Sequence, residues 1–210
     1  MPILADNVVE TLASEESRYL EMIDRGELVE TGVFAYHKAI PFKIFMGTDH
    51  YVGEVLAACR LLVLVKGQDV VYACYYKTAE NEYFGNRVVQ VEVRQSPAWP
   101  GLARAMMRHH FLRHFDAVRT DISGTHDGRR MWQKLYADYR KELYFYQGRL
   151  NIDLRTSSGD NNQDAACPDR VTHIKSLKTG VAMRDEMWHD NKLGNVVVIY
   201  MANKPLRGDQ

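Results

Sequence analysis

The sequence predicts an α/β protein of the α+β kind, with one mixed β-sheet of six to seven strands flanked by helices. Two observations support this class. First, apolar residues alternate or run together in several short segments that are bounded by turn residues, which is typical of strands. Second, the strand Val88 to Arg94 is followed by a helical pattern and then at once by another strand. A strand–helix–strand unit requires parallel pairing, so the sheet is mixed.

Two antiparallel strands are predicted just before this central strand. The apolar runs 60–65 and 70–76 are separated by Lys66-Gly67-Gln68-Asp69, which is a hairpin signal. A second turn at Gly85-Asn86 leads into 88–94. The three strands therefore pair in chain order.

The N-terminal region is predicted to open with an amphipathic helix. Asp6 or Asn7 can cap it, and Gly26 lies past its end. The next segment, 32–44, mixes aromatic and aliphatic residues and is interrupted by Pro41. It is interpreted as either a strand or a packed loop.

Helices are predicted over 102–114 and 128–139, on either side of a strand at 117–122. Further strands follow at 143–154 and 195–201. We expect 117–122 to be the parallel neighbour of the central strand.

The chain is predicted to form a single domain over 1–210, with an insertion at 155–193 between the last two strands. The first part of the insertion is polar and rich in turn residues, which is typical of a surface excursion. A short helix near 183–188 is an option for its second part. The insertion is a candidate surface for a protein assembly partner.

Composition excludes several classes of function. The 27 basic and 27 acidic residues cancel, so net charge indicates neither nucleic acid nor an anionic membrane as a partner. No apolar run reaches the roughly 18 residues of a spanning helix. Three cysteines without metal-ligand spacing suit a reducing, cytoplasmic compartment. No metal site is predicted, and Ser123 lacks the frame of a catalytic nucleophile.

Two segments carry a resemblance to a known family. Ala98-Trp99-Pro100-Gly101-Leu102-Ala103 follows the central strand, and Arg129 to Tyr136 opens the helix after the next strand. With the order of elements, they resemble the GNAT superfamily of acyl-CoA N-acyltransferases, whose loop reads Arg/Gln-x-x-Gly-x-Gly/Ala. Gly101 and Ala103 match this loop, and Ala98 departs from it. In the family's Asn-x-x-Ala-x-x-x-Tyr signature, only Tyr136 matches.

The resemblance implies acetyl-CoA or another acyl-CoA as cofactor and an amine-bearing acceptor that the sequence does not identify. The diphosphate would bind at the N–H groups of the turn and the thioester beside the central strand. The implied cofactor-binding residues are Val93, Trp99, Gly101, Leu102, Ala103 and Arg104. Tyr136 would be the acid that protonates the departing thiolate. The alternatives are a plain strand-to-helix turn and a core tyrosine.

Glu92 is the candidate base, because it lies near the end of the central strand, where a carboxylate can remove the amine proton directly or through water. The alternative is an ordinary ion pair with a neighbour on the same strand face, which also carries Arg94. His50 and Tyr51 are candidate substrate residues at a pocket rim, because a polar segment becomes apolar there.

Two functions follow from these patterns. The first is an acyl-CoA-dependent N-acyltransferase. The second is a non-catalytic protein of this fold that serves as a structural or binding component of a larger assembly. Proteins similar to this fold also occur in phage genomes, and some are packaged in virions, so a virion is the alternative location. The departures at Ala98 and Arg129 favour the second function.

Overall fold

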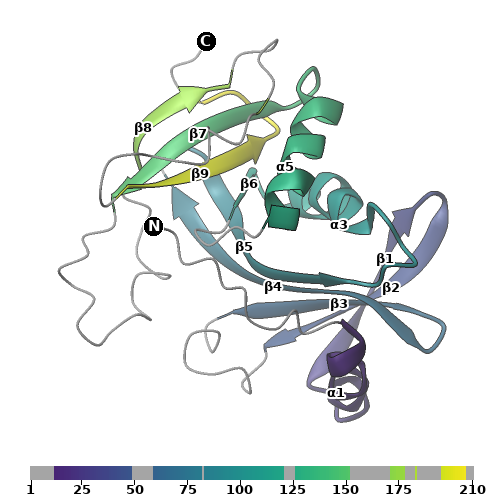
Figure 1. Cartoon of the computed structure of the whole chain (residues 1–210). Coiled ribbons are helices and arrows are strands. Elements are labelled where there is room, and N and C mark those ends of the chain that lie inside the picture. Colours follow the sequence, from purple (N-terminus) through teal and green to yellow (C-terminus); the bar gives the residue numbers. More distant parts are fainter. Residues whose placement is uncertain are drawn as a thin grey trace. The chain divides into compact units, whose positions relative to one another are not determined.

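The structure is a computed structural model that describes residues 12–48, 59–81, 83–120, 126–151, 171–177, 183 and 195–206 (Figure 1). The chain divides into two compact units. We call residues 6–77 with 90–113 the N-terminal unit, and the second, built mainly of 78–89 and 114–210, the C-terminal unit. Each unit is described by itself.

The N-terminal unit holds a helix, a meander of strands and a second helical segment. Its elements are α1 (Leu12–Asp24), β1 (Leu28–His37), β2 (Ile40–Thr48), β3 (Arg60–Lys66), most of β4 (Asp69–Asn81), the end of β5 (Gly85–Gln95), α3 (Leu102–Ala105), the π-helix η1 (Met106–Phe111) and the start of α4 (Leu112–His114). The pairs β1–β2, β2–β3 and β3–β4 are all antiparallel. The predicted hairpin at 60–76 is thereby confirmed.

The C-terminal unit contains the rest of β4 and β5 and the remaining elements. These are β6 (Ala117–Arg119), α5 (His126–Tyr139), β7 (Tyr144–Asn151), β8 (Val171–Ser176) and β9 (Asn195–Ala202). β6 pairs with β5 in parallel, with Val88 opposite Val118, and with β9 in antiparallel orientation. The predicted parallel pairing of the central strand is confirmed.

The described strands form one large mixed, mostly antiparallel sheet in the order β1-β2-β3-β4-β5-β6-β9-β7-β8. The α+β class and the mixed sheet are confirmed. The predicted number of six to seven strands is wrong, because the described residues form nine. One missed strand is β8, which lies within the predicted insertion 155–193 and pairs with β7.

The segment 32–44, left open between a strand and a loop, belongs to the β1–β2 hairpin. Its two-residue turn is Lys38-Ala39, and both residues have positive φ, 50° and 63°. Such turns normally use Asn-Gly or Asp-Gly, because most other residues are strained at positive φ. A turn signal was therefore missing from the sequence at this place.

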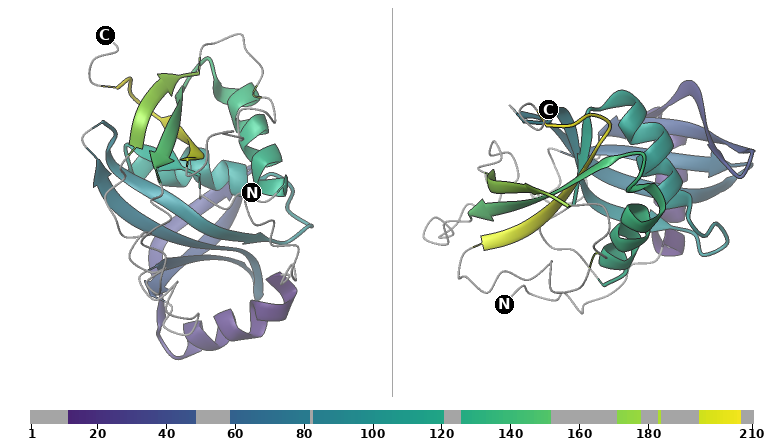
Figure 2. Two further views of the ribbon diagram at one scale, coloured as in Figure 1. Left: turned by 60° about the vertical axis from the view of Figure 1, so that its left-hand side comes forward. Right: turned by 90° about the horizontal axis from the view of Figure 1, so that it is seen from above.

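The core of the N-terminal unit lies between α1 and one face of β1 to β4 (Figures 1 and 2). Tyr19 and Met22 of α1 are buried against Phe45, Val63 and Tyr75 of the strands. The helix is held further by Glu16, whose carboxylate accepts a hydrogen bond from the N–H of Val70 at 2.9 Å. α1 confirms the predicted N-terminal helix from Leu12 onward, and Asp6 and Asn7 lie outside the described residues.

The predicted helix at 102–114 is present, but its middle turn is a π-helix rather than an α-helix. Met106 and Phe111 are both buried and lie five residues apart. In an α-helix the neighbours on one side are three or four residues apart. The i→i+5 hydrogen bonding of a π-helix suits this wider spacing.

In the C-terminal unit an aromatic cluster fills the core. Phe84 stacks on Tyr200 with 4.0 Å between ring centroids and contacts Tyr146 edge-on at 5.6 Å. The chain after β9 is tied to this cluster, because the N–H of Leu206 donates a hydrogen bond to the Tyr146 hydroxyl at 3.0 Å. No helix among the described residues is long and apolar enough to cross a membrane.

Candidate functional site

The turn between β5 and α3 carries the predicted acyl-CoA loop, and several of its N–H groups donate hydrogen bonds within the chain. The acceptors are the Ser96 carbonyl for Trp99 (3.1 Å), the Trp99 carbonyl for Leu102 (3.2 Å) and Gln95 Oε1 for Ala103 (2.7 Å). These N–H groups belong to the set that was predicted to hold a diphosphate. Their hydrogen bonds stabilise the turn itself.

Three further residues of the turn, Pro97, Ala98 and Pro100, add little to an anion site. Pro97 and Pro100 have no N–H to donate. The N–H of Ala98, between them, donates a hydrogen bond to Oγ of Ser96 at 3.4 Å. An anion at this turn would therefore meet a much poorer cradle than a helix N-terminus with all of its N–H groups available.

Gly101 adopts the left-handed conformation that suits glycine, with φ of 85°. A Cβ at this position would lie 3.3 Å from Nη2 of Arg104 and 3.7 Å from Cε1 of His37. The Arg104 guanidinium thus lies close to the glycine backbone. The glycine is explained by the backbone conformation of the turn, without any ligand.

The other implied cofactor-binding side chains mostly pack. Leu102 and Ala103 are buried, whereas Val93, Trp99 and Arg104 are half-buried. The Trp99 ring contacts Phe42 of β2 edge-on, with 5.0 Å between centroids. This turn is consequently anchored to the strand layer of its own unit by an aromatic contact that the sequence did not indicate.

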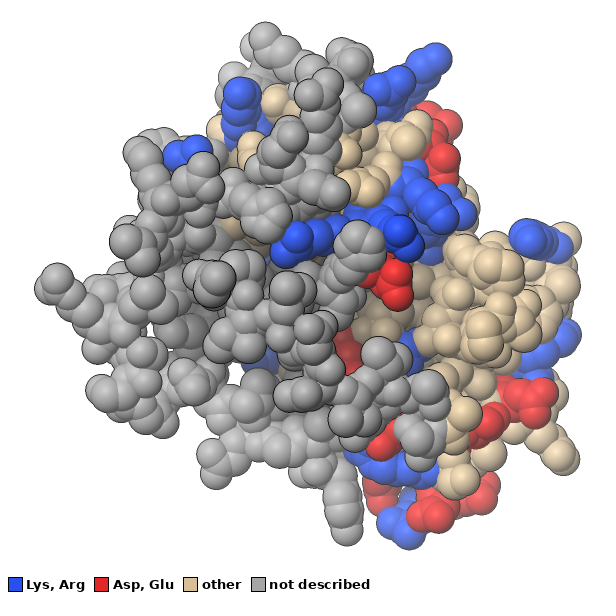
Figure 3. All heavy atoms as spheres, viewed as in Figure 1, with Lys and Arg blue, Asp and Glu red and all other residues tan. Residues whose placement is uncertain are grey.

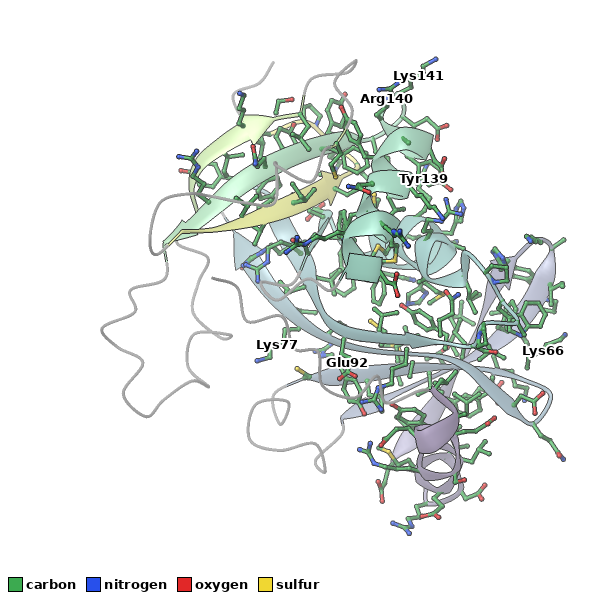
Figure 4. The ribbon with its side chains drawn as sticks, viewed as in Figure 1. Lys66, Lys77, Glu92, Tyr139, Arg140 and Lys141 are labelled. Carbon is green, nitrogen blue, oxygen red and sulfur yellow. The ribbon has the colours of Figure 1, made fainter. Side chains whose placement is uncertain are left out.

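Glu92, the candidate base, is labelled in Figure 4. It is ion-paired on its own strand. Nε of Arg94 donates a hydrogen bond to Glu92 Oε1 at 2.7 Å. The same guanidinium lies 3.5 Å from the carboxylate of Glu15 on α1. The structure thus contains the ion pair that was the alternative interpretation of Glu92. Through the contact of Arg94 with Glu15, this group of charges links β5 to α1.

Tyr136, the candidate acid, is buried in the C-terminal unit with 3% of its surface exposed. Its ring contacts Phe145 of β7 edge-on at 5.2 Å. Arg140, just past the end of α5 (Figure 4), lies with its guanidinium 6.0 Å from the ring centroid of Tyr136. These contacts fit a packing residue on an amphipathic helix.

Sequence reasoning missed two buried arginines on the parallel pair. Arg87 of β5 and Arg119 of β6 have 1% and 8% of their surfaces exposed. Val89 lies opposite Arg119, and Arg119 lies opposite Tyr200 of β9. The two arginines therefore share the face of the aromatic cluster. The only sequence signal for this burial is the position of Arg87 directly before an apolar run. It is a weak signal, because charged residues are rarely buried.

Two predictions cannot be compared with the structure, because His50 and Tyr51 lie outside the described residues. Within the described part of the chain, no group of three or more His, Cys, Asp or Glu side chains could hold a metal ion. A comparison of the chain with protein-family models and with curated proteins finds no match.

Proposed function

We propose that this chain is a non-catalytic protein with a fold similar to that of the acyl-CoA N-acyltransferases, acting as a structural or binding component of a larger assembly. One observation carries the proposal. The N–H groups of Trp99, Leu102 and Ala103, which an acyl-CoA would need, are hydrogen-bonded within the turn. Binding a diphosphate there would require these hydrogen bonds to break.

The two groups that would perform the chemistry support the same proposal. The carboxylate of Glu92 is paired with Arg94 through a charge-assisted hydrogen bond, which commits it to the guanidinium. Tyr136 is packed against Phe145. Each side chain thus has a structural role that does not involve a substrate.

A partner protein is the ligand class that the fold offers most readily. The insertion 155–193 contributes β8, which is the last strand in the order of described strands. A terminal strand has backbone N–H and C=O groups on one side that no neighbouring strand uses. Such a strand is suited to contact with another chain.

The second candidate is an acyl-CoA-dependent N-acyltransferase of unidentified amine acceptor. The observation that favours it is the parallel β5–β6 pair joined through the 102–114 helical segment and followed by α5, β7 and β9. This is the element order on which the family resemblance rests. Fold alone does not imply function. The hydrogen bonds within the β5–α3 turn are therefore stronger evidence than the order of elements.

Calorimetric titration with acetyl-CoA tests the choice between the two. We expect no saturable heat at ligand concentrations up to about 1 mM, where even weak specific binding is detectable. Saturable binding that is lost in Gly101→Glu would contradict the observation that carries the proposal and favour the second candidate. The control is Gly67→Glu, at a glycine that also has positive φ but, unlike Gly101, has no atom within 4 Å of a Cβ. That control should leave any binding unchanged.

Tyr136→Phe tests the acid directly. Because the hydroxyl is the only group removed, we expect a loss of about 1 kcal/mol in the free energy of unfolding, the usual contribution of one hydrogen bond. Chemical denaturation measures it. If Tyr136 were the acid of an acyltransferase, turnover of acetyl-CoA with a panel of amines would instead fall by roughly 10²–10⁴. Such a fall in turnover would contradict the interpretation of Tyr136 as a packing residue.

A further inference from the structure

β1 exposes an unusual amount of apolar surface. Of the six large hydrophobic residues that are exposed in the described chain, four lie on this strand: Val29 (63%), Val33 (50%), Phe34 (44%) and Tyr36 (60%). β1 is also the first strand in the order of described strands, so none of them pairs with its outer side. Proteins usually protect such a strand with charges or proline, because its free backbone groups recruit other strands.

A bulge in the β1–β2 hairpin prevents further regular pairing along the first half of β1 only. The register shifts between Glu30 and Phe34, so residues 31–33 form a bulge, and Gly32 within it has φ of 69°. A bulge bends the strand and ends regular pairing on its outer side. Beyond the bulge, Phe34 to His37 pair regularly with β2 up to the turn. We call residues 34–37 the outer arm.

The backbone of the outer arm has a defined direction. His37 lies opposite Ile40 and closes the two-residue turn, which makes it a hydrogen-bonded pair. Hydrogen-bonded and non-hydrogen-bonded pairs alternate in an antiparallel ladder. Tyr36 opposite Pro41 is therefore a non-hydrogen-bonded pair, in agreement with the missing N–H of proline. It follows that the N–H and C=O groups of Phe34 and Tyr36 point outward.

We propose that the outer arm is a self-association site, where a second copy of this chain adds its own outer arm in antiparallel orientation. The two-fold axis passes at Ala35, normal to the sheet. Phe34 then lies opposite Tyr36 of the partner subunit, and the reverse pair follows by symmetry. In each pair the N–H of one residue donates to the C=O of the other, because both present these groups outward.

The occupant is a second copy because the outer arm is complementary to itself. In this register, side chains that lie opposite each other are on the same face of the sheet. Phe34 and Tyr36 therefore form two aromatic cross-strand pairs with the partner subunit, and such pairs stabilise antiparallel sheets. A closed two-fold contact also needs the same patch on both subunits. Within the paired part of the outer arm, no like charges are brought together. Figure 3 marks the charged side chains of the described residues on one face of the molecule.

The contact is short, so the association is expected to be weak and reversible. An arm of this length buries less surface than a permanent interface. We expect a dissociation constant on the order of 10–100 µM. The inference does not depend on the proposed function, since an enzyme and a scaffold can both self-associate through this strand.

Sedimentation equilibrium of the full chain at several concentrations tests the proposal. The wild-type chain is expected to pass from monomer to dimer as concentration rises. Phe34→Lys/Tyr36→Lys places lysine opposite lysine of the partner subunit and should abolish the dimer. Phe34→Glu/Tyr36→Lys removes the same aromatic side chains but places glutamate opposite lysine, so it should restore at least part of the association.

The matched control is Tyr144→Lys, because Tyr144 is an aromatic strand residue with the same exposed fraction as Phe34, 44%. It should dimerise like the wild type, and circular dichroism should report intact folding in all variants. A wild-type chain that stays monomeric at every concentration overturns the proposal. A dimer that survives in the double lysine variant overturns it too, as does a failure of Phe34→Glu/Tyr36→Lys to restore association.

Discussion

Replacing Gly47 by alanine is expected to lower the free energy of unfolding by about 3 kcal/mol or more, because no room exists for a side chain there. A Cβ at Gly47 would lie 2.3 Å from the carbonyl oxygen of Glu27 and 2.9 Å from Cδ2 of Leu28. The first of these atoms belongs to the backbone, where α1 leads into β1, and cannot move aside as a side chain can. Gly47 of β2 lies directly opposite Leu28, so the shift would separate the two strands.

Gly32→Ala is the matched control for this prediction. Gly32 is also a strand glycine of the same hairpin, but a Cβ would meet no atom within 4 Å, and only its φ of 69° opposes the change. Alanine there should cost about 1–2 kcal/mol, as expected for a left-handed residue with a Cβ. Urea denaturation of both variants gives the comparison. Equal losses would mean that the close approach at Gly47 is relaxed without cost.

Elements with strong local patterns could be predicted from the sequence. The hairpin at Gly67 and the parallel unit around Val88 both carry turn chemistry and apolar runs that leave few alternatives. The β1–β2 hairpin could not, because its turn at Lys38-Ala39 contains neither glycine nor asparagine. Pro41 added to the ambiguity, although it occupies a strand position where no N–H is required.

The candidate site was harder to predict than the fold, because its residues are defined by their contacts. The sequence placed Glu92 and Arg94 on one strand face and left the ion pair as an alternative, and the structure contains that pair. Nothing in the sequence indicated that the Gln95 side chain accepts a hydrogen bond from Ala103. A hydrogen bond between residues eight apart, at a strand-to-helix turn, follows from a loop conformation that no local pattern specifies.

The second large effect is expected from Arg94, which lies between two acidic side chains. Its side chain is only 8% exposed, and it pairs with Glu92 and with Glu15 of α1. Burial by itself lowers the pKa of Arg94, yet its hydrogen bond to Glu92 and the nearby charges hold the pKa above its ordinary value. The guanidinium is thus charged in the folded protein at every accessible pH.

Arg94→Leu should lower the free energy of unfolding by about 1–3 kcal/mol, because it leaves the Glu92 carboxylate without its cation at a partly buried site, whereas Glu15 keeps Arg18 as a partner. Adding Glu92→Gln to that variant removes the uncompensated charge and should recover most of the loss. Arg25→Leu is the matched control. Arg25 also pairs with two carboxylates, Glu21 and Glu27, but is 62% exposed.

Exposed ion pairs contribute only about 0–1 kcal/mol, so Arg25→Leu should be almost neutral. Guanidinium chloride screens such pairs, and urea is therefore the denaturant for all four proteins. The ranking expected is wild type and Arg25→Leu together, then the double variant Arg94→Leu/Glu92→Gln, then Arg94→Leu. If the double variant is no more stable than Arg94→Leu, the loss comes from packing of the arginine stem rather than from the charges. In that case the ion network is not what holds α1 against β5.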